Sequence, residues 1–155
     1  MAVKPVPEGF HTITPQLTLA DAAKAIEHYK KALGAVELAR NADPSGKKIW
    51  HSMLKIGDSM IFVNDNFPDM GGSISSSSLW LYVTDVDASF KRATEAGFTA
   101  KMPPADMFWG DRMAHVGDPY GQLWTLATRT KDLTPAEMKA AEEKFIAQTK
   151  HGKPA

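Results

Sequence analysis

The sequence contains no cysteine. Its absence excludes disulfide bonds, thiol nucleophiles and metal sites built from thiolates. A chain without cysteine is compatible with a reducing compartment, where disulfides do not persist.

Long apolar runs are missing as well. The opening segment MAVKPVPEGFHT has no hydrophobic stretch of the length found in signal peptides. No other segment approaches the ~20 consecutive apolar residues that a membrane-spanning helix requires. The sequence therefore predicts a cytoplasmic protein without a membrane partner.

Neither sign of charge is in excess, because 18 Lys and Arg residues balance 18 Asp and Glu residues. Proteins that bind nucleic acids usually carry a basic surplus or a basic stripe, so nucleic acid is excluded as the main partner. A net charge of zero is compatible with self-association. With 155 residues, 43% of them hydrophobic, the chain is long enough to bury the core of one domain.

The first half of the chain reads as strand, helix and three further strands. Asp21 stands at a helix N-cap position and Gly34 at a helix end, and Gly57-Asp58 is a turn dipeptide between two apolar runs. The expected elements, in chain order, are a strand over 11–19, a helix over 22–33, a short strand over 35–40 and a hairpin of strands over 49–57 and 59–65.

The second half repeats this order after a segment rich in Gly, Ser and Asp. The expected elements are a strand over 78–84, a helix over 88–96 that Asp85 or Asp87 caps, a short strand over 98–102, a turn over 103–108 and a hairpin over 109–129. The same elements in the same order indicate an internal duplication. We therefore predict an α+β fold of two tandem βαβββ modules, module one over 9–65 and module two over 78–130, joined by a linker over 66–77.

The C-terminal region, 131–155, follows this single domain over 1–130. Thr134 and Glu137 have the spacing of a capping box, and Pro135 occupies the first helical position between them. Met138 and Phe145 lie on one face of the expected helix. We predict an amphipathic helix that packs on its own domain through these two side chains, in preference to one that binds a partner.

Three segments resemble the vicinal oxygen chelate superfamily, which includes glyoxalases, bleomycin resistance proteins and dioxygenases. They are DAAKAIEHYKKALGA, IGDSMIFVND and GDPYGQLWTLATR. The segments TPQLTLADAAKAIEHY, MFWGDR and ATRTKDLTPAEM are more similar to its PhnB-like branch. The resemblance spans roughly residues 9–140. It implies that the modules form a curved, cup-shaped mixed sheet that holds a small-molecule ligand, and that the chain pairs as a homodimer, side by side or with modules exchanged.

The resemblance also implies four positions for metal ligands, one on each of four strands, which metal-dependent members fill with His, Gln or Glu. Counting from Asp21, Gly57-Asp58, Gly97 and Asp118 places them in this chain. The four positions are Thr14, Phe62, Ser78 and Thr125. None of these side chains is a carboxylate or an imidazole, which divalent ions prefer. We therefore expect no metal and no other cofactor.

Strand alternation predicts which side chains face the cup. If Thr14, Ser78 and Thr125 face inward, the neighbours at the same strand spacing do so too. The predicted lining comprises Gln16, Met60, Phe62, Asn64, Trp80, Tyr82, Leu123 and Ala127. Such an aromatic lining suits a planar or apolar small molecule. In the alternative interpretation, Phe62, Trp80 and Tyr82 fill a collapsed core.

The segment 108–115 is the best candidate for the rim of the cup. Phe108 and Trp109 supply two large aromatic side chains next to Gly110, and Arg112 can hold an anionic ligand group by a bidentate contact. Alternatively, Arg112 tethers this loop through Asp111. His115 follows on the same segment and completes the set of predicted ligand-binding residues.

The sequence thus favours a metal-independent protein that binds an aromatic or antibiotic-like small molecule. One alternative is a metal-dependent lyase, isomerase or dioxygenase with atypical ligands such as Asn64, Asp111 and His115. A further alternative is a metal-independent enzyme that uses Tyr82, His115 or Asp111 as acid or base. The sequence assigns no catalytic residue.

Overall fold

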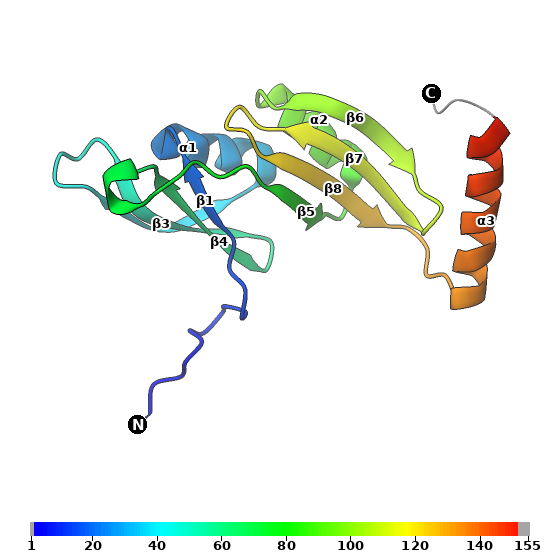
Figure 1. Ribbon diagram of the computed structural model, residues 1–155, viewed down its shortest axis with the longest axis horizontal. Helices are drawn as coiled ribbons and strands as arrows, with labels where there is room; N and C mark the ends of the chain where they lie inside the picture. Colours follow the sequence, from blue (N-terminus) through cyan, green and yellow to red (C-terminus); the bar gives the residue numbers. More distant parts are fainter. Residues whose placement is uncertain (1, 152–155) are drawn as a thin grey trace.

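The computed structural model describes residues 2–151, and its side chains through residue 149 (Figure 1). Two series of strands and helices follow one another along the chain. The elements are β1 (Gln16–Leu19), α1 (Ala22–Leu33), β2 (Val36–Ala42), β3 (Ile49–Ile56), β4 (Ser59–Asp65), the 3-10 turn η1 (Pro68–Met70), β5 (Ser78–Tyr82), α2 (Val86–Glu95), β6 (Thr99–Asp106), β7 (Asp111–Gly117), β8 (Leu123–Arg129) and α3 (Pro135–His151).

The strands form two four-stranded mixed sheets with the same topology, β1-β4-β3-β2 and β5-β8-β7-β6. In each sheet the first and last strands of the module pair in parallel, and the other neighbours are antiparallel. The predicted α+β fold of two tandem βαβββ modules is confirmed, with the sheet divided between the modules. Figure 1 shows the sheets side by side along the long axis, with α1 and α2 on the same side of them.

Both module helices begin at aspartate caps. The Asp21 side chain accepts a hydrogen bond from the backbone N–H of Lys24, and α1 ends at Gly34 in the left-handed conformation that glycine adopts without strain. In module two, Asp85 is the cap, accepting from the N–H of Ala88. This contact resolves the choice between Asp85 and Asp87.

Alternation along the strands separates the core from the open face of each sheet. The side chains that alternate with the predicted lining of the cup pack against the helices. Leu17, Leu19, Ile61, Val63, Trp124 and Leu126 are buried, and Leu79, Leu81 and Val83 are partly buried against them. The opposite faces of the two sheets are therefore free of the helices.

One core spans both modules. The buried ring of Tyr29 on α1 lies edge-on to Trp124 of β8, and its hydroxyl donates to Asp118 Oδ2 at 2.7 Å. Arg92 of α2 donates to the backbone carbonyl of Lys31 at the end of α1, at 2.7 Å. Helix α1 is thereby held by module two as well as by its own sheet.

Two strand boundaries differ from the sequence prediction by more than two residues, and both lie next to prolines. Strand β1 begins at Gln16 instead of residue 11, because Pro15 cannot donate to a ladder and the chain before it is irregular. Strand β6 continues through Pro103 and Pro104, which were predicted to form a turn. The register shift between Met102 and Ala105 accommodates them as a bulge at the edge of the sheet.

Helix α3 stands beside the end of the second sheet (Figure 1). Thr134 and Glu137 form the predicted capping box, with the Thr134 N–H donating to Glu137 Oε2 at 2.7 Å. The Phe145 ring lies 5.0 Å from that of Phe108, centroid to centroid. Within residues 2–151, none of the helices has the length and apolar character needed to cross a membrane.

Candidate functional site

The face of the sheets opposite α1 and α2 is hollowed in each module, and a further pocket lies between the modules. The module-two pocket, about 440 Å³, is lined by Trp80, Tyr82, Trp109, Asp111, Arg129 and Met138. The module-one pocket, about 490 Å³, is lined by Gln16, Thr18, Trp50, Asn64, Asp65, Phe67, Met70, Gly71 and Gly72. The junction pocket, about 280 Å³, lies between the modules and includes Thr14, Met60, Leu79, Trp80 and Trp124.

Aromatic side chains line the module-two pocket without filling it. Trp80 and Tyr82 stand two residues apart on β5, with their ring centroids 6.1 Å apart, and are 48% and 59% exposed. They lie on the face away from the helices because Leu79 and Leu81 take the other face. These two rings therefore do not form a collapsed core.

A buried carboxylate forms the wall behind these rings. Asp111 opens β7 and is 2% exposed, and its Oδ2 accepts hydrogen bonds from the Tyr82 hydroxyl and from Trp109 Nε1, both at 3.1 Å. Its Oδ1 is buried and has no hydrogen-bond partner among the described residues. Partial burial of the hydroxyl and the hydrogen bond with Asp111 raise the pKa of Tyr82, so this phenol is a donor at neutral pH.

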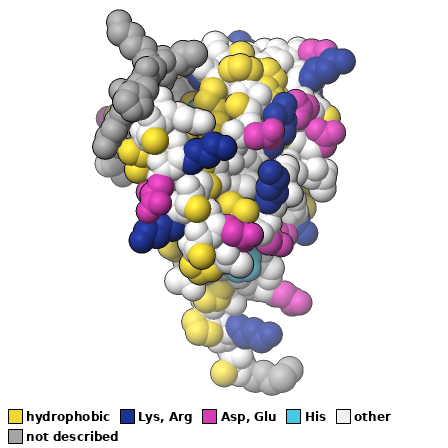
Figure 2. Space-filling model, turned by 90° about the vertical axis from the view of Figure 1, so that its right-hand side faces the viewer, with side chains coloured by type: hydrophobic (Ala, Val, Ile, Leu, Met, Phe, Trp, Pro, Cys, Tyr) yellow, Lys and Arg dark blue, Asp and Glu magenta, His cyan; other side chains and the backbone are white. Residues whose placement is uncertain are grey.

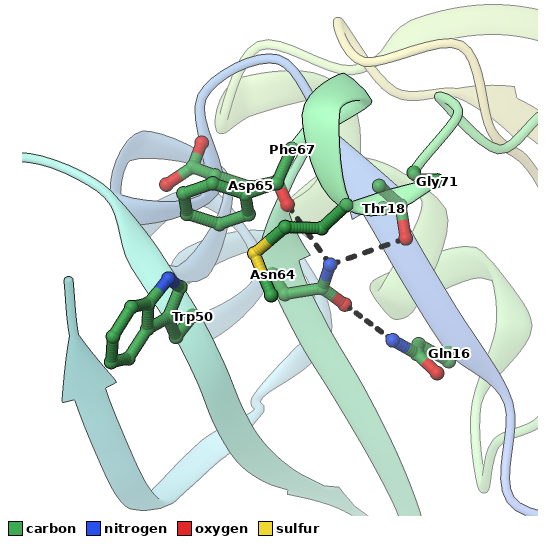
Figure 3. Close-up of a pocket in the computed structure, with 9 residues that line it drawn as sticks. Gln16, Thr18, Trp50, Asn64, Asp65, Phe67 and Gly71 are labelled. Atoms are coloured by element: carbon green, nitrogen blue, oxygen red, sulfur yellow. Dashed lines mark hydrogen bonds between the residues drawn. The ribbon is translucent and has the colours of Figure 1, made fainter.

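The module-one pocket is organised by side-chain amides. Gln16 Nε2 donates to Asn64 Oδ1 at 2.8 Å, and Asn64 Nδ2 donates to Thr18 Oγ1 at 3.2 Å. Figure 3 shows Asn64 between Gln16 and Thr18, with Trp50 across the pocket. The turn η1 brings Met70 to the pocket edge, so the segment predicted as a linker contributes to its wall.

Three predicted site residues, Trp80, Tyr82 and Trp109, meet in the module-two pocket, whereas Gln16 lies in the module-one pocket. Phe108 stands next to the three, with its ring 5.1 Å from that of Trp109. The structure thus divides the predicted lining among three pockets, since Met60 lines the junction pocket and Trp80 borders both that pocket and the module-two pocket.

The remaining predicted residues lie outside the described pockets. Phe62 packs its ring against His51 at 4.6 Å and against Phe10 of the N-terminal segment at 5.8 Å. His115 contacts Thr125 Oγ1 through Nδ1 at 2.9 Å, on the same face of β7 as Asp111. Arg112 lies on the opposite face of β7 from Asp111, because neighbouring side chains of a strand alternate.

Arg112 forms ion pairs on the helix side of the second sheet. Its Nε lies 2.7 Å from Asp87 Oδ2 on α2, and its Nη1 lies 3.3 Å from Asp106 Oδ1. These contacts raise the pKa of the guanidinium and lower that of the Asp87 carboxyl, the Arg112–Asp87 hydrogen bonds being the first cause of each. The structure does not bring Arg112 to the aromatic pocket, and the tether it makes runs to Asp87 and Asp106 instead of Asp111.

The family model of the Glyoxalase/Bleomycin resistance protein/Dioxygenase superfamily matches residues 9–126. This match covers most of the chain, including both modules. The chain belongs to this superfamily. The resemblance seen in the sequence is thereby confirmed at the level of the superfamily.

Similar proteins are found in mycobacteria and in solved structures. The uncharacterized protein Rv0887c of Mycobacterium tuberculosis is 41% identical over 138 residues, covering 83% of this chain and 81% of that protein. TioX from Micromonospora sp. ML1 superposes with a TM-score of 0.66 at 26% identity, over 77% of this chain and 98% of TioX. TnmS3, an antibiotic binding protein from Streptomyces sp. CB03234, gives a TM-score of 0.59 at 26% identity, over 84% of this chain and 99% of TnmS3.

The positions that the superfamily uses for metal ligands do not fit a metal ion in this chain. Register places Phe62 beside Gln16 and Thr125 beside Trp80, so an aromatic ring and a hydroxyl stand at two of the positions. A divalent ion prefers carboxylate or imidazole donors. Among the described residues there is no group of three or more His, Asp or Glu side chains arranged around a common point.

The atypical ligands considered for a metal are also dispersed. Asn64 belongs to the module-one pocket, where both ends of its amide are hydrogen-bonded within the protein. Asp111 belongs to the module-two pocket, and His115 is hydrogen-bonded to Thr125. The structure therefore does not bring these three side chains together as ligands of one metal ion.

Sequence reasoning missed several pocket residues. Arg129 follows Thr125 and Ala127 at strand spacing, so the alternation that was applied to β8 contained the signal for it. Met138 and Trp50 had no such signal. Met138 reaches the pocket only because α3 returns beside the second sheet, and Trp50 only because η1 closes over the first.

Proposed function

We propose that this chain is a metal-independent protein that binds an aromatic or antibiotic-like small molecule in the module-two pocket. Its role is binding, as in the bleomycin resistance proteins of its superfamily, and no catalytic step is assigned to it. The proposal also places the chain in the PhnB-like branch and makes it a homodimer.

The observation that carries the proposal is the open aromatic pocket. Trp80, Tyr82 and Trp109 border a space of about 440 Å³, a volume within the range of sites for small organic ligands. Large aromatic side chains at the surface lose little conformational entropy when a ligand orders them, since they have few rotatable bonds. They gain contact area when a planar molecule stacks on them. The description of TnmS3 as an antibiotic binding protein supports the same class of ligand.

A homodimer is supported by the exposed apolar side chains. Ile13, Val36 and Trp50 are each about half exposed or more, in addition to the aromatic residues of the module-two pocket. Figure 2, viewed from the α3 end, shows hydrophobic side chains at the surface among acidic and basic side chains of both signs. With no net charge to oppose association, a second copy of the chain is the partner we propose for these exposed apolar side chains.

Tryptophan fluorescence tests the proposed binding directly. Titration with a library of planar aromatic compounds and antibiotics is expected to quench the emission, because Trp80 and Trp109 line the pocket. The variants Trp80→Phe and Trp109→Phe are each expected to lose part of the ligand-dependent quenching, and the double variant is expected to lose most of it. Trp50→Phe is the matched control and is expected to retain it, since Trp50 lies in the module-one pocket. An absence of quenching across the whole library would contradict the proposed function.

Metal analysis tests the metal-independent part of the proposal. Protein purified without chelator is expected to carry metal far below one ion per chain, and ligand binding is expected to be unchanged by added chelator. A stoichiometry near one, with binding abolished by chelator, would instead support a metal-dependent lyase, isomerase or dioxygenase.

A further inference from the structure

The module-two pocket contains the buried carboxylate of Asp111, to which an apolar ligand would donate no hydrogen bond. One oxygen, Oδ2, accepts from Tyr82 and Trp109, whereas Oδ1 has no partner among the described residues. A buried charged acceptor without a donor carries an unfavourable desolvation free energy. A ligand that brings a donor to this wall of the pocket removes that penalty.

Asp111 forms no ion pair among the described residues, although Arg129 stands opposite it in the register of β7 and β8. Arg129 lines the same pocket, but its Nε lies 2.7 Å from Asp132 Oδ1 and forms an ion pair there. Arg112, the next residue in sequence, is held by Asp87 and Asp106 on the other face of the sheet. The two carboxylates of Asp111 and Asp132 thus carry one more negative charge than the guanidinium of Arg129 neutralises.

The rings of the pocket favour a positive charge at the same place. Trp80 and Tyr82 are tilted by 48° to one another, and Trp109 donates its indole N–H to Asp111 so that its ring borders the same space. The faces of aromatic rings carry negative electrostatic potential and attract ammonium groups within about 6 Å, most strongly for Trp. Rings and carboxylate therefore select the same sign of charge.

We propose that the module-two pocket recognises a protonated amine on an aromatic ligand. The ammonium N–H donates to the Asp111 carboxylate, which lines the pocket, and the rings of Trp80, Tyr82 and Trp109 surround the cation and the adjoining apolar part of the ligand. This inference rests on the proposed function, because it specifies the chemistry of the ligand in that same pocket. An anionic ligand is disfavoured, because it would meet Asp111 and would have to draw Arg129 away from Asp132.

Calorimetric titration with a matched pair of probes tests the inference. The probes are 1-naphthylmethylamine, which is protonated at pH 7, and 1-naphthalenemethanol, which has the same ring and no charge. The wild-type chain is expected to bind the ammonium about 10-fold to 100-fold more tightly than the alcohol, the range given by a hydrogen bond to a charged group. Equal affinity for the two probes would overturn the inference.

Two substitutions with opposite expected effects on ammonium binding test which charged residues of the pocket select the ligand. Asp111→Asn is expected to remove the preference for the ammonium. The affinity for the alcohol is expected to change less than about 3-fold, because the alcohol carries no charge. Arg129→Gln, at a largely exposed side chain, is expected to tighten ammonium binding about 2-fold to 5-fold, because it removes a neighbouring positive charge. Lys91→Gln on α2 removes the same charge far from the pocket and is expected to leave both affinities unchanged.

The outcomes separate this inference from the proposed function. Should Asp111→Asn fail to fold, as its circular dichroism would show, the rise in affinity in Arg129→Gln still decides the sign of the charge that the pocket selects. If the alcohol binds as well as the ammonium and Arg129→Gln has no effect, the inference fails while small-molecule binding stands. If neither probe binds and the fluorescence library also fails, both the inference and the proposed function fail.

Discussion

At the scale of single residues, the aspartates of the two Gly-Asp turns differ sharply in what they bind. Asp58, in module one, is exposed and accepts, among the described residues, only from Ser59. Asp118, in module two, accepts through Oδ2 from the Tyr29 hydroxyl and from Trp124 Nε1, and through Oδ1 from two backbone N–H groups of its own turn. The same dipeptide is a surface turn in one module and a contact between modules in the other.

Replacement of Asp118 by Ala is expected to lower the free energy of unfolding by about 3 kcal/mol, because it leaves the buried donors of Tyr29 and Trp124 unpaired. Urea denaturation followed by circular dichroism measures this change. The matched control Asp58→Ala, at the equivalent turn, is expected to change it by less than about 0.5 kcal/mol. Equal effects of the two substitutions would show that the Asp118 contacts do not hold the modules together.

Residue-level predictions from the sequence succeeded where strand alternation alone decides. Trp80 and Tyr82 were predicted to face away from the helices and do so, with Leu79 and Leu81 on the opposite face. Arg112 shows the limit. It lies within a segment predicted as rim, and only the observed start of β7 at Asp111 determines that Asp111 faces the pocket and Arg112 faces α2.

At the scale of elements, α2 and α3 have caps of comparable chemistry and very different surroundings. Asp85 caps α2, whose residues Val86 and Ala93 are buried in the shared core. The capping box of Thr134 and Glu137 begins α3, in which only Met138 and Ala141 are partly buried among residues 135–149. Helix α3 therefore depends on its own ends more than on packing.

Removal of the α3 cap is expected to destabilise that helix alone, whereas removal of the α2 cap is expected to destabilise the whole domain. Thr134→Ala is expected to cost about 1 kcal/mol of helix stability and to speed amide hydrogen exchange in α3 alone. Asp85→Ala is expected to lower the unfolding free energy of the whole domain by a similar amount, about 1 kcal/mol. Hydrogen exchange and thermal unfolding together measure both. A global loss of stability in Thr134→Ala would mean that α3 unfolds with the core.

At the scale of the whole molecule, a shared core places two hollowed sheet faces side by side. Tyr29, Phe98 and Trp124 pack together from elements of both modules, with Tyr29 at the centre. The core therefore resists separation of the modules, while the face away from α1 and α2 keeps exposed apolar side chains. Apolar surface of this kind is typical of a surface that a partner covers.

Association of two copies is expected in solution. Size-exclusion chromatography with light scattering is expected to give twice the mass of one chain at micromolar concentration. Because apolar burial drives this association, the mass is expected to change little between low and high salt. A monomeric mass throughout, with ligand binding intact, would remove the homodimer from the proposal.

The sequence by itself determined the order of elements, the caps of α1 and α3, the duplicated modules and the division of each strand into a core face and an open face. Each of these depends on residues close together in the chain, through hydrogen bonds of a cap or the two-residue period of a strand. The tertiary structure alone decided that Gln16 and Trp80 lie in separate pockets, that Arg112 pairs with Asp87, and that α3 brings Met138 to the second pocket. These contacts join residues distant in sequence, and their geometry follows from strand register and module packing, which no local pattern encodes.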